Sequence, residues 1–364
     1  MSNTALVVGG TGPTGPYIVE GLLRRGYKVA ILHRGEHEVE LPAEVEHIHG
    51  DPHFVDTLEQ VLGGRTFDVV VCTYGRLRLV AQVMRRHTPR FIGIGGAAYQ
   101  IFYRASHLPE GAPVPVPEHF PLQTDPNLDK FSSLIALSEL EVMKAHREGA
   151  YNATYFRYPM VYGPRQLAPP EWSIMRRILD GRRAIILPDG GLKLHSRGYA
   201  ENMAHAVLLA VDQPEVSAGK SYNVRDERLL ALQEWVTIIT RTMGWEWEYV
   251  SAPYVQARTS RPYSRGGHHV ALDISSLQRD LGYKDVVPAE EAVARTVKWY
   301  LEHRPEPGGE VERQLRDPFD YAAEDRLIQI CKEAAERVRE VPFAGFKYVH
   351  PYAHPKQPMG QAHD

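Results

Sequence analysis

The sequence predicts an α/β fold, in which a doubly wound parallel sheet carries a smaller C-terminal substrate domain. Short apolar runs alternate with helix-like segments from Thr4 to about Tyr162, as in parallel sheets covered by helices on both faces. A glycine-rich turn joins the first apolar run to the first helical segment. The chain has 364 residues, 43% of them hydrophobic, which is enough for a large core and a second, smaller one.

The first expected strand, Thr4 to Val8, leads directly into a turn with the spacing GxxGxxG. Gly9 would make the turn, Gly12 would let a pyrophosphate approach the backbone, and Gly15 would let the following helix pack closely. The N-terminal N–H groups and dipole of that helix would face the phosphates. The turn therefore predicts a Rossmann-type dinucleotide site, with contacts from Gly9, Thr11, Gly12, Pro13, Thr14 and Gly15.

The second and third strands indicate which dinucleotide binds. The run from Lys28 to Leu32 ends at Arg34 without an acidic residue at the strand end, where an Asp or Glu would accept from ribose hydroxyls. Arginine suits a 2′-phosphate, so we predict NADP rather than NAD, although a solvated loop arginine is the simpler interpretation of Arg34. After the next run, Glu46 to His49, Asp51 could meet the adenine edge.

The remaining elements define the domains. Strands are expected at 68–72, 91–94 and 154–157, and a helix at about 128–147, after a proline-rich stretch over 99–129 that could cover a ligand. We assign residues 1–164 mainly to the dinucleotide-binding domain, with 192–240 returning to it. Residues 165–191 and 241–304 form the substrate-binding domain. Residues 305–364 form an extension with a helix at about 321–341, expected to cover the substrate cleft or a partner subunit.

The composition narrows the partners. A net charge of −3 and a pI near 6.6 give no basic field for nucleic acid, and no apolar run approaches a membrane span. The two cysteines, Cys72 and Cys331, are typical of buried thiols in a reducing compartment, so we expect a cytoplasmic protein. We also expect a small-molecule substrate, and a homodimer is compatible with the sequence. His350 and His354 have helical ligand spacing, but neighbouring prolines forbid that helix, so no metal is predicted.

With these residues in place, the chain resembles the extended short-chain dehydrogenase/reductases, the NAD(P)-dependent epimerase/dehydratase group, from about Thr4 to Arg304. The resemblance rests on the glycine turn, Gly50-Asp51, the run Arg157-Tyr158-Pro159-Met160-Val161-Tyr162-Gly163-Pro164, and Tyr222-Asn223-Val224. It implies that Tyr158, Met160 and Val161 border the nicotinamide, and that residues 163–269 shape the substrate pocket.

The sequence departs from this family at the catalytic positions. The family uses a tyrosine and a lysine four residues apart on one helix, where the ammonium lowers the pKa of the phenol. If Glu139 marks the usual acidic position of that helix, Phe131 stands in place of the tyrosine and Ile135 in place of the lysine. The family's serine is missing as well, because residues 93–98 carry no hydroxyl.

Other side chains are candidates for the missing chemistry. Tyr99 and Tyr158 are the candidate proton donors, although each could simply pack, and His195, Arg197 and His268 are the candidate substrate ligands. The pairs at 176–177 and 182–183 are arginines that could bind an anion or form a charged helix face. We favour an NADP(H)-dependent oxidoreductase that reduces a carbonyl or related group of a small polar or aromatic substrate. An epimerase, dehydratase or lyase with a tightly held cofactor, and a non-catalytic NADP sensor, remain alternatives.

Overall fold

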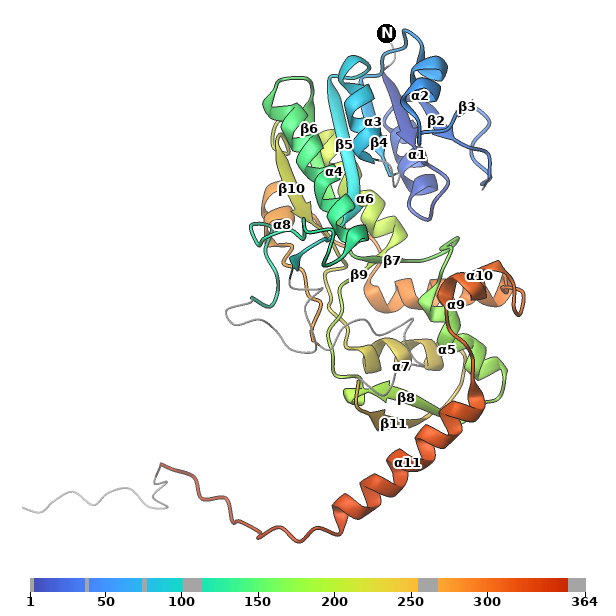
Figure 1. Ribbon diagram of the computed structural model, residues 1–364, viewed down its shortest axis with the longest axis vertical. Coiled ribbons are helices and arrows are strands. Elements are labelled where there is room, and N and C mark those ends of the chain that lie inside the picture. The colour runs from blue at the N-terminus through green and yellow to red at the C-terminus, as the bar shows by residue number, and fades with distance from the viewer. Residues whose placement is uncertain (1–2, 37–38, 74–76, 101–112, 255–267, 353–364) are drawn as a thin grey trace, which may run out of the picture.

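The main unit of the structure is a seven-stranded parallel sheet (Figure 1). The computed structural model describes residues 3–36, 39–73, 77–100, 113–254 and 268–352. The strand order is β10-β6-β5-β4-β1-β2-β3, and all neighbouring strands are parallel. The strands are β1 (Thr4–Val8), β2 (Lys28–His33), β3 (Glu46–His49), β4 (Val69–Cys72), β5 (Arg90–Gly96), β6 (Asn152–Tyr158) and β10 (Lys220–Asn223). This arrangement confirms the predicted α/β fold.

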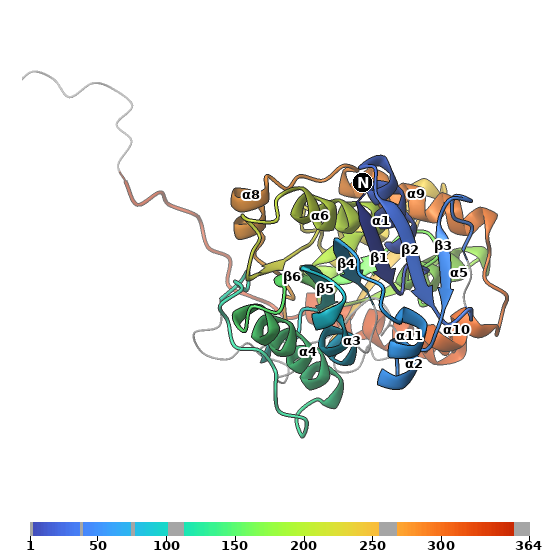
Figure 2. The same cartoon turned by 90° about the horizontal axis from the view of Figure 1, so that it is seen from above.

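Helices cover both faces of this sheet, as Figure 2 shows. One face packs against α1 (Gly15–Arg24), α6 (Ala200–Asp212) and α8 (Ser275–Leu281), and the other against α2 (Val55–Leu62), α3 (Leu77–Val83) and α4 (Lys130–Arg147). A single 3-10 turn, Met84–Arg86, follows α3. Strand β4 is buried along its whole length, which explains why it is a continuous apolar run rather than an alternating one.

A smaller unit lies below the carboxyl ends of the strands in Figure 1. It contains α5 (Pro170–Leu179), α7 (Leu232–Thr242), α9 (Ala289–Glu302) and the parallel pair β8 (Ala184–Pro188) and β11 (Glu248–Ala252). The structure differs from the expected domain division at residues 232–240. These lie in α7, which packs with α5 and α9 because Trp235, Val236 and Ile239 are buried in that core. Strands β7 (Met160–Tyr162) and β9 (Arg197–Tyr199) pair between the two units.

The C-terminal extension packs on the outer side of the smaller unit. It contains α10 (Glu310–Leu315) and α11 (Tyr321–Arg339), and Ile328 of α11 is buried against β8 and β11. From residue 333 to residue 352, the end of α11 and the segment after it point away from the body (Figure 1) and are exposed. Within the described residues the extension thus covers the outer face of β8 and β11. Among all the residues that the structure describes, no helix is both long enough and apolar enough to span a membrane.

Ion pairs hold this extension in place. The side chain of Arg177 is 1% exposed and donates to Asp317 at 2.7 Å and to Glu324 at 2.5 Å. Arg176 pairs with Glu312 at 2.7 Å, and Arg182 pairs with Asp325. The sequence leaves two interpretations of the arginine pairs open, binding of a ligand anion and a charged helix face. Arg176, Arg177 and Arg182 fit neither interpretation, because their guanidinium groups pair with carboxylates of the extension.

Candidate functional site

The glycine turn has the geometry expected of a phosphate cradle. Gly9 has a φ of 98°, which a side chain rarely adopts, and its N–H donates to the Leu32 carbonyl at 2.9 Å. A Cβ on Gly15 would lie 2.0 Å from the Gly10 carbonyl oxygen, so the close approach it permits is between helix α1 and the turn itself. A Cβ on Gly12 would meet no atom within 4 Å. The turn is therefore tight at both ends and open in the middle, where a pyrophosphate would approach.

The neighbouring residues of the turn support the same site. Thr14 is the N-cap residue of α1 and is buried, and Pro16 occupies the first turn of the helix. The side chain of Thr14 makes no capping hydrogen bond to the first N–H groups of α1, so it does not compete with an anion that binds there. The hydroxyl of Thr11 donates within the turn, to the Gly9 carbonyl at 3.3 Å. Pro13 lies between these residues at the open middle of the turn.

At the ribose end, the structure gives Arg34 a partner that sequence reasoning missed. Arg34 follows β2, and its guanidinium lies 2.5 Å from the carboxylate of Glu36. Asp51 follows β3 and accepts from the backbone N–H and the ring Nδ1 of His53, at 2.9 and 2.6 Å. The first of these bonds contributes most to holding the pKa of Asp51 below its ordinary value. Glu36 stands only two residues after Arg34, and this short spacing was the available signal.

Apolar residues occupy the expected catalytic end of α4. Gly96 ends β5, and a Cβ built on it would lie 3.3 Å from Cδ1 of Ile135. Ile135 therefore lies beside the carboxyl end of β5, which supports the alignment that puts it at the lysine position. Phe131, one turn earlier, is 72% exposed. Neither side chain can accept or donate a proton.

Tyr99, a candidate proton donor, is fully buried in a polar network. Its hydroxyl donates to Oδ1 of Asn223 at 2.6 Å and accepts from the guanidinium of Arg157. Arg157 is held by Glu139 through two bonds of 2.8 and 2.6 Å. Burial raises the pKa of Tyr99 to about 12, although Arg157 opposes the shift. This environment fixes the hydroxyl between two partners and favours a structural role.

Tyr158, the second candidate, ends β6 and packs between the sheet and α6. Its hydroxyl donates to the Met203 carbonyl at 3.1 Å, and burial raises the pKa of the phenol above its ordinary value. Met160 and Val161 follow in β7 and are half-buried. These three residues thus lie together at the carboxyl end of β6, next to the Gly96 end of β5. The hydroxyl of Tyr158 is therefore bonded to the backbone of α6, and the side chain of Thr14 also interacts with it and opposes the rise in its pKa.

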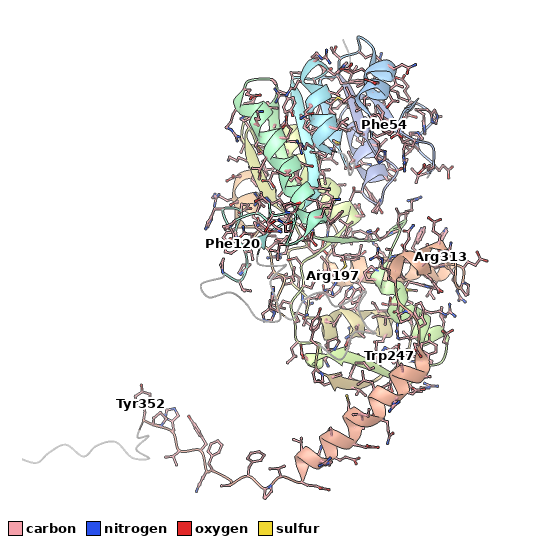
Figure 3. The ribbon with its side chains drawn as sticks, viewed as in Figure 1. Phe54, Phe120, Arg197, Trp247, Arg313 and Tyr352 are labelled. Atoms are coloured by element: carbon pink, nitrogen blue, oxygen red, sulfur yellow. The ribbon has the colours of Figure 1, made fainter. Side chains whose placement is uncertain are left out.

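The three candidate substrate ligands lie on two adjacent segments. His195 forms a β-bridge with Val270, two residues after His268, and Arg197 begins β9. All three side chains are buried. Figure 3 shows Arg197 between the sheet and the smaller unit. The structure therefore brings His195, Arg197 and His268 to one region, although they are up to 73 residues apart (195 to 268).

Two further residues belong to this region and were not predicted. The guanidinium of Arg197 stacks over the ring of Trp235, 4.4 Å from its centroid, and Glu171 of α5 influences the pKa of Arg197 through its charge. Burial raises the pKa of Glu171 to about 7, opposed by its own backbone N–H and by Arg197. The signal for Glu171 was its position in an otherwise mostly apolar stretch, followed by Trp172, Ser173, Ile174 and Met175.

The prediction from the sequence is that the chain has no metal site. In the part of the chain that the structure describes, no group of three or more histidine, cysteine, aspartate or glutamate residues is arranged to hold a metal ion. His350 lies in the exposed tail, and His354 lies outside the described residues.

Comparisons with known proteins agree with this geometry. Residues 133–224 match the model of the NAD dependent epimerase/dehydratase family. A dTDP-glucose 4,6-dehydratase of Streptomyces griseus is 29% identical over 179 residues, 48% of this chain and 50% of that protein. The chloroplast stem-loop binding protein of 41 kDa b of Arabidopsis thaliana is 23% identical over 242 residues, 61% of this chain and 58% of that protein. The chain thus spans about half the length of the curated relatives it matches.

Solved structures share the fold. The Bordetella bronchiseptica enzyme WbmH, solved in complex with NAD+, superposes with a TM-score of 0.66 at 19% identity, covering 83% of this chain and 99% of WbmH. In sequence, this chain is thus similar over residues 133–224 to the NAD dependent epimerase/dehydratase family, and it shares its fold with solved structures such as WbmH.

Proposed function

We propose that the protein is an NADP(H)-dependent oxidoreductase that reduces a carbonyl or related group of a small polar or aromatic substrate, without the tyrosine and lysine typical of the family it resembles. The observation that carries this proposal is the contrast between the open glycine cradle and Ile135 beside Gly96. The dinucleotide, when bound, supplies the hydride. The chain would hold it at the turn from Gly9 to Gly15 and along Tyr158, Met160 and Val161.

The preference for NADP rests on Arg34. Its ion pair with Glu36 is partly exposed, with 35% and 57% of the two side chains accessible, and such pairs contribute about 0–1 kcal/mol. A doubly charged phosphate that accepts two bonds from a guanidinium is a stronger partner. We therefore expect a 2′-phosphate to displace Glu36 from Arg34, which a ribose hydroxyl would not do.

The proton donor is a separate part of the proposal. Because the hydroxyls of Tyr99 and Tyr158 are both committed to other groups, we propose that they have structural roles and that the proton comes from solvent, which reaches α4 at the exposed Phe131. Replacing Tyr99 with Phe should lower the melting temperature but leave kcat within about threefold. A loss of about 100-fold or more in kcat, in a folded variant, would identify Tyr99 as the donor.

A small molecule fits the site better than a nucleic acid does. One relative is named for binding stem-loops, but this chain has a net charge of −3 and offers little general attraction to a phosphate backbone. We therefore propose a small-molecule substrate held near Arg197.

Fluorescence titration with NADPH and NADH, followed by a panel of carbonyl substrates, tests the proposal. We expect tighter binding of NADPH and its oxidation in the presence of at least one carbonyl compound. Equal affinity for both nucleotides would contradict the role of Arg34. Tight binding without turnover of any carbonyl would favour the two alternatives, an enzyme that retains its cofactor or a sensor.

A further inference from the structure

The region around Arg197 contains buried side chains with polar atoms that make no hydrogen bond to the described residues. Glu171 is 0% exposed, Arg197 is 5% exposed and Trp235 is 0% exposed. Within the described ranges, none of five atoms makes a hydrogen bond: the two carboxyl oxygens of Glu171, Nε and Nη2 of Arg197, and Nε1 of Trp235. A buried polar group without a partner costs about 1–3 kcal/mol, and a charged one more. Such a cost, repeated at one place, indicates groups that bind a ligand.

The free atoms of Arg197 form one edge of the guanidinium. Two other arginines show what this edge binds, since Arg25 grips Asp212 and Arg157 grips Glu139 through the same Nε and Nη2 atoms, at 2.6 to 2.8 Å. The remaining nitrogen of Arg197, Nη1, has a long bond of 3.4 Å to the His195 carbonyl. Arg197 therefore presents, fully buried, the two-pronged edge that elsewhere in this protein binds a carboxylate.

Glu171 limits which anion fits. The guanidinium of Arg197 is its charged neighbour, but no ion pair joins the two groups. Two tyrosines whose pKa values Glu171 influences are already occupied: the hydroxyl of Tyr162 donates to Asp226 at 2.8 Å, and that of Tyr300 donates to the Gln166 carbonyl at 3.0 Å. Nε2 of His268, in the same region as Arg197, makes no hydrogen bond to the described residues. A multiply charged phosphate beside Glu171 would add like-charge repulsion. A singly charged carboxylate, in contrast, could accept a hydrogen bond from the O–H of a protonated Glu171.

We propose that the Nε/Nη2 edge of Arg197 and the carboxyl group of Glu171 form a binding site for a carboxylate group of the substrate, above the ring of Trp235. Arg197 supplies two parallel hydrogen bonds, and Glu171, in its protonated form, supplies a third donor. Burial raises the pKa of Glu171 to about 7, so this donor is available at and below neutral pH. This inference rests on the proposed function only in assigning the region to substrate binding.

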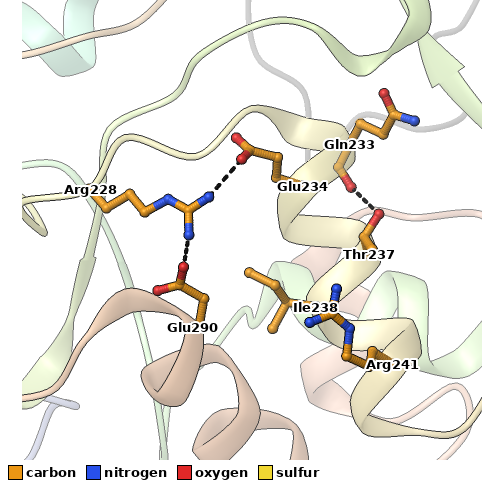
Figure 4. Close-up of a pocket in the computed structure, with 7 residues that line it drawn as sticks. All are labelled: Arg228, Gln233, Glu234, Thr237, Ile238, Arg241 and Glu290. Carbon is orange, nitrogen blue, oxygen red and sulfur yellow. Dashed lines mark hydrogen bonds and ion pairs between the residues drawn. The ribbon is translucent and has the colours of Figure 1, made fainter.

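The test uses the full chain and three probes, which are glucuronate, inorganic phosphate and uridine diphosphate, with affinity measured by calorimetry. We expect glucuronate to bind most tightly. R197K keeps a cation but loses the two-pronged edge, and it should weaken glucuronate binding at least tenfold. The matched control is R241K, in an open hollow of about 330 Å³ on α7 (Figure 4), which should change nothing.

A second variant keeps the test decisive if R197K does not fold. Affinity for glucuronate should fall about 30-fold in the wild-type protein between pH 6 and pH 8.5, as Glu171 loses its proton, and should stay constant in E171Q, whose amide remains a donor. The inference is overturned if phosphate or uridine diphosphate binds more tightly than glucuronate, if glucuronate does not bind, if folded R197K binds it normally, or if E171Q keeps the pH dependence. Titration of NADPH in the same samples separates this result from the proposed function, because neither Arg197 nor Glu171 lies in the glycine cradle.

Discussion

Glu171 should make the protein less stable as pH rises, and replacing it with glutamine should remove that dependence. Burial raises the pKa of this carboxyl group from 4.5 to about 7 in the folded protein. The folded state therefore binds a proton more tightly than the unfolded state does, so stability is lost as pH rises above 4.5 and levels off above about 7. Because the glutamine side chain of E171Q cannot ionise, the stability of this variant lacks that dependence on pH.

The expected size follows from the two pKa values. The two pKa values differ by about 2.5 units, and each unit corresponds to about 1.4 kcal/mol. Relative to low pH, the free energy of unfolding should therefore fall by about 3 kcal/mol at pH 8 and by less than about 1 kcal/mol at pH 5. For 364 residues, an unfolding entropy of about 2.1 cal/mol/K per residue converts 3 kcal/mol into about 4 °C. Asp285, whose pKa burial also raises to about 7, is present in both proteins and cancels from the comparison.

The assay is thermal unfolding of wild-type protein and E171Q at half-unit steps from pH 5 to pH 8.5. The quantity of interest is the change with pH in the difference between the two melting temperatures, because any constant effect of the amide then drops out. E44Q, at an exposed glutamate, is the matched control and should follow the wild-type curve. If the wild-type and E171Q curves remain parallel over this range, the buried, proton-binding state of Glu171 is refuted.

Three further predictions concern the extension and the cofactor site. R177A should destabilise the protein by about 3–5 kcal/mol, because it leaves Asp317 and Glu324 buried without their cation. R182A should cost less than about 1 kcal/mol, because its partner Asp325 is exposed. Chemical denaturation measures both effects, and equal effects would contradict the anchoring role of Arg177. G15A should abolish NADPH binding, since its Cβ would lie 2.0 Å from the Gly10 oxygen, whereas G64A, with open space around it, should bind normally in the same titration. E36Q should tighten NADPH binding about threefold and leave NADH unchanged by releasing Arg34, and an equal gain for both nucleotides would count against 2′-phosphate recognition.

The elements of the main sheet could be predicted because their signals are local. The predicted boundaries of β1 and β3 match the structure, and those of β2 and β4 differ by one residue each. A strand buried on both faces must be apolar throughout, and a turn with positive φ must contain glycine, so both leave a mark in a few consecutive residues. The sequence predicted the other unit for residues 232–240, whereas in the structure they lie in α7, whose apolar residues are buried in the core of the smaller unit. An apolar face shows that a helix is buried, but not against which unit.

The candidate site could be predicted only in part, for a related reason. His195, Arg197 and His268 were chosen as polar residues in a segment expected to bind substrate, and the structure does place them in one region. Whether a buried polar side chain has a partner depends on every neighbour, so neither the free edge of Arg197 nor the unpartnered carboxyl of Glu171 could be recognised from the chain alone. The same holds for Tyr99, whose hydroxyl is occupied by residues 58 and 124 positions away.

By itself, the sequence determined the parallel sheet and the glycine-rich turn, and it predicted that Phe131 and Ile135 stand where the resembled family has a tyrosine and a lysine. These depend on residue type and short spacing. Only the tertiary structure decided that the paired arginines anchor the extension, through contacts such as Arg177 with Asp317, 140 residues apart. It also decided that Arg197 and Glu171 are both buried, that each influences the pKa of the other through its charge, and that no ion pair joins them. The physical reason is that hydrogen bonds and desolvation depend on distance in space, and residues far apart in the chain leave no local pattern when they meet.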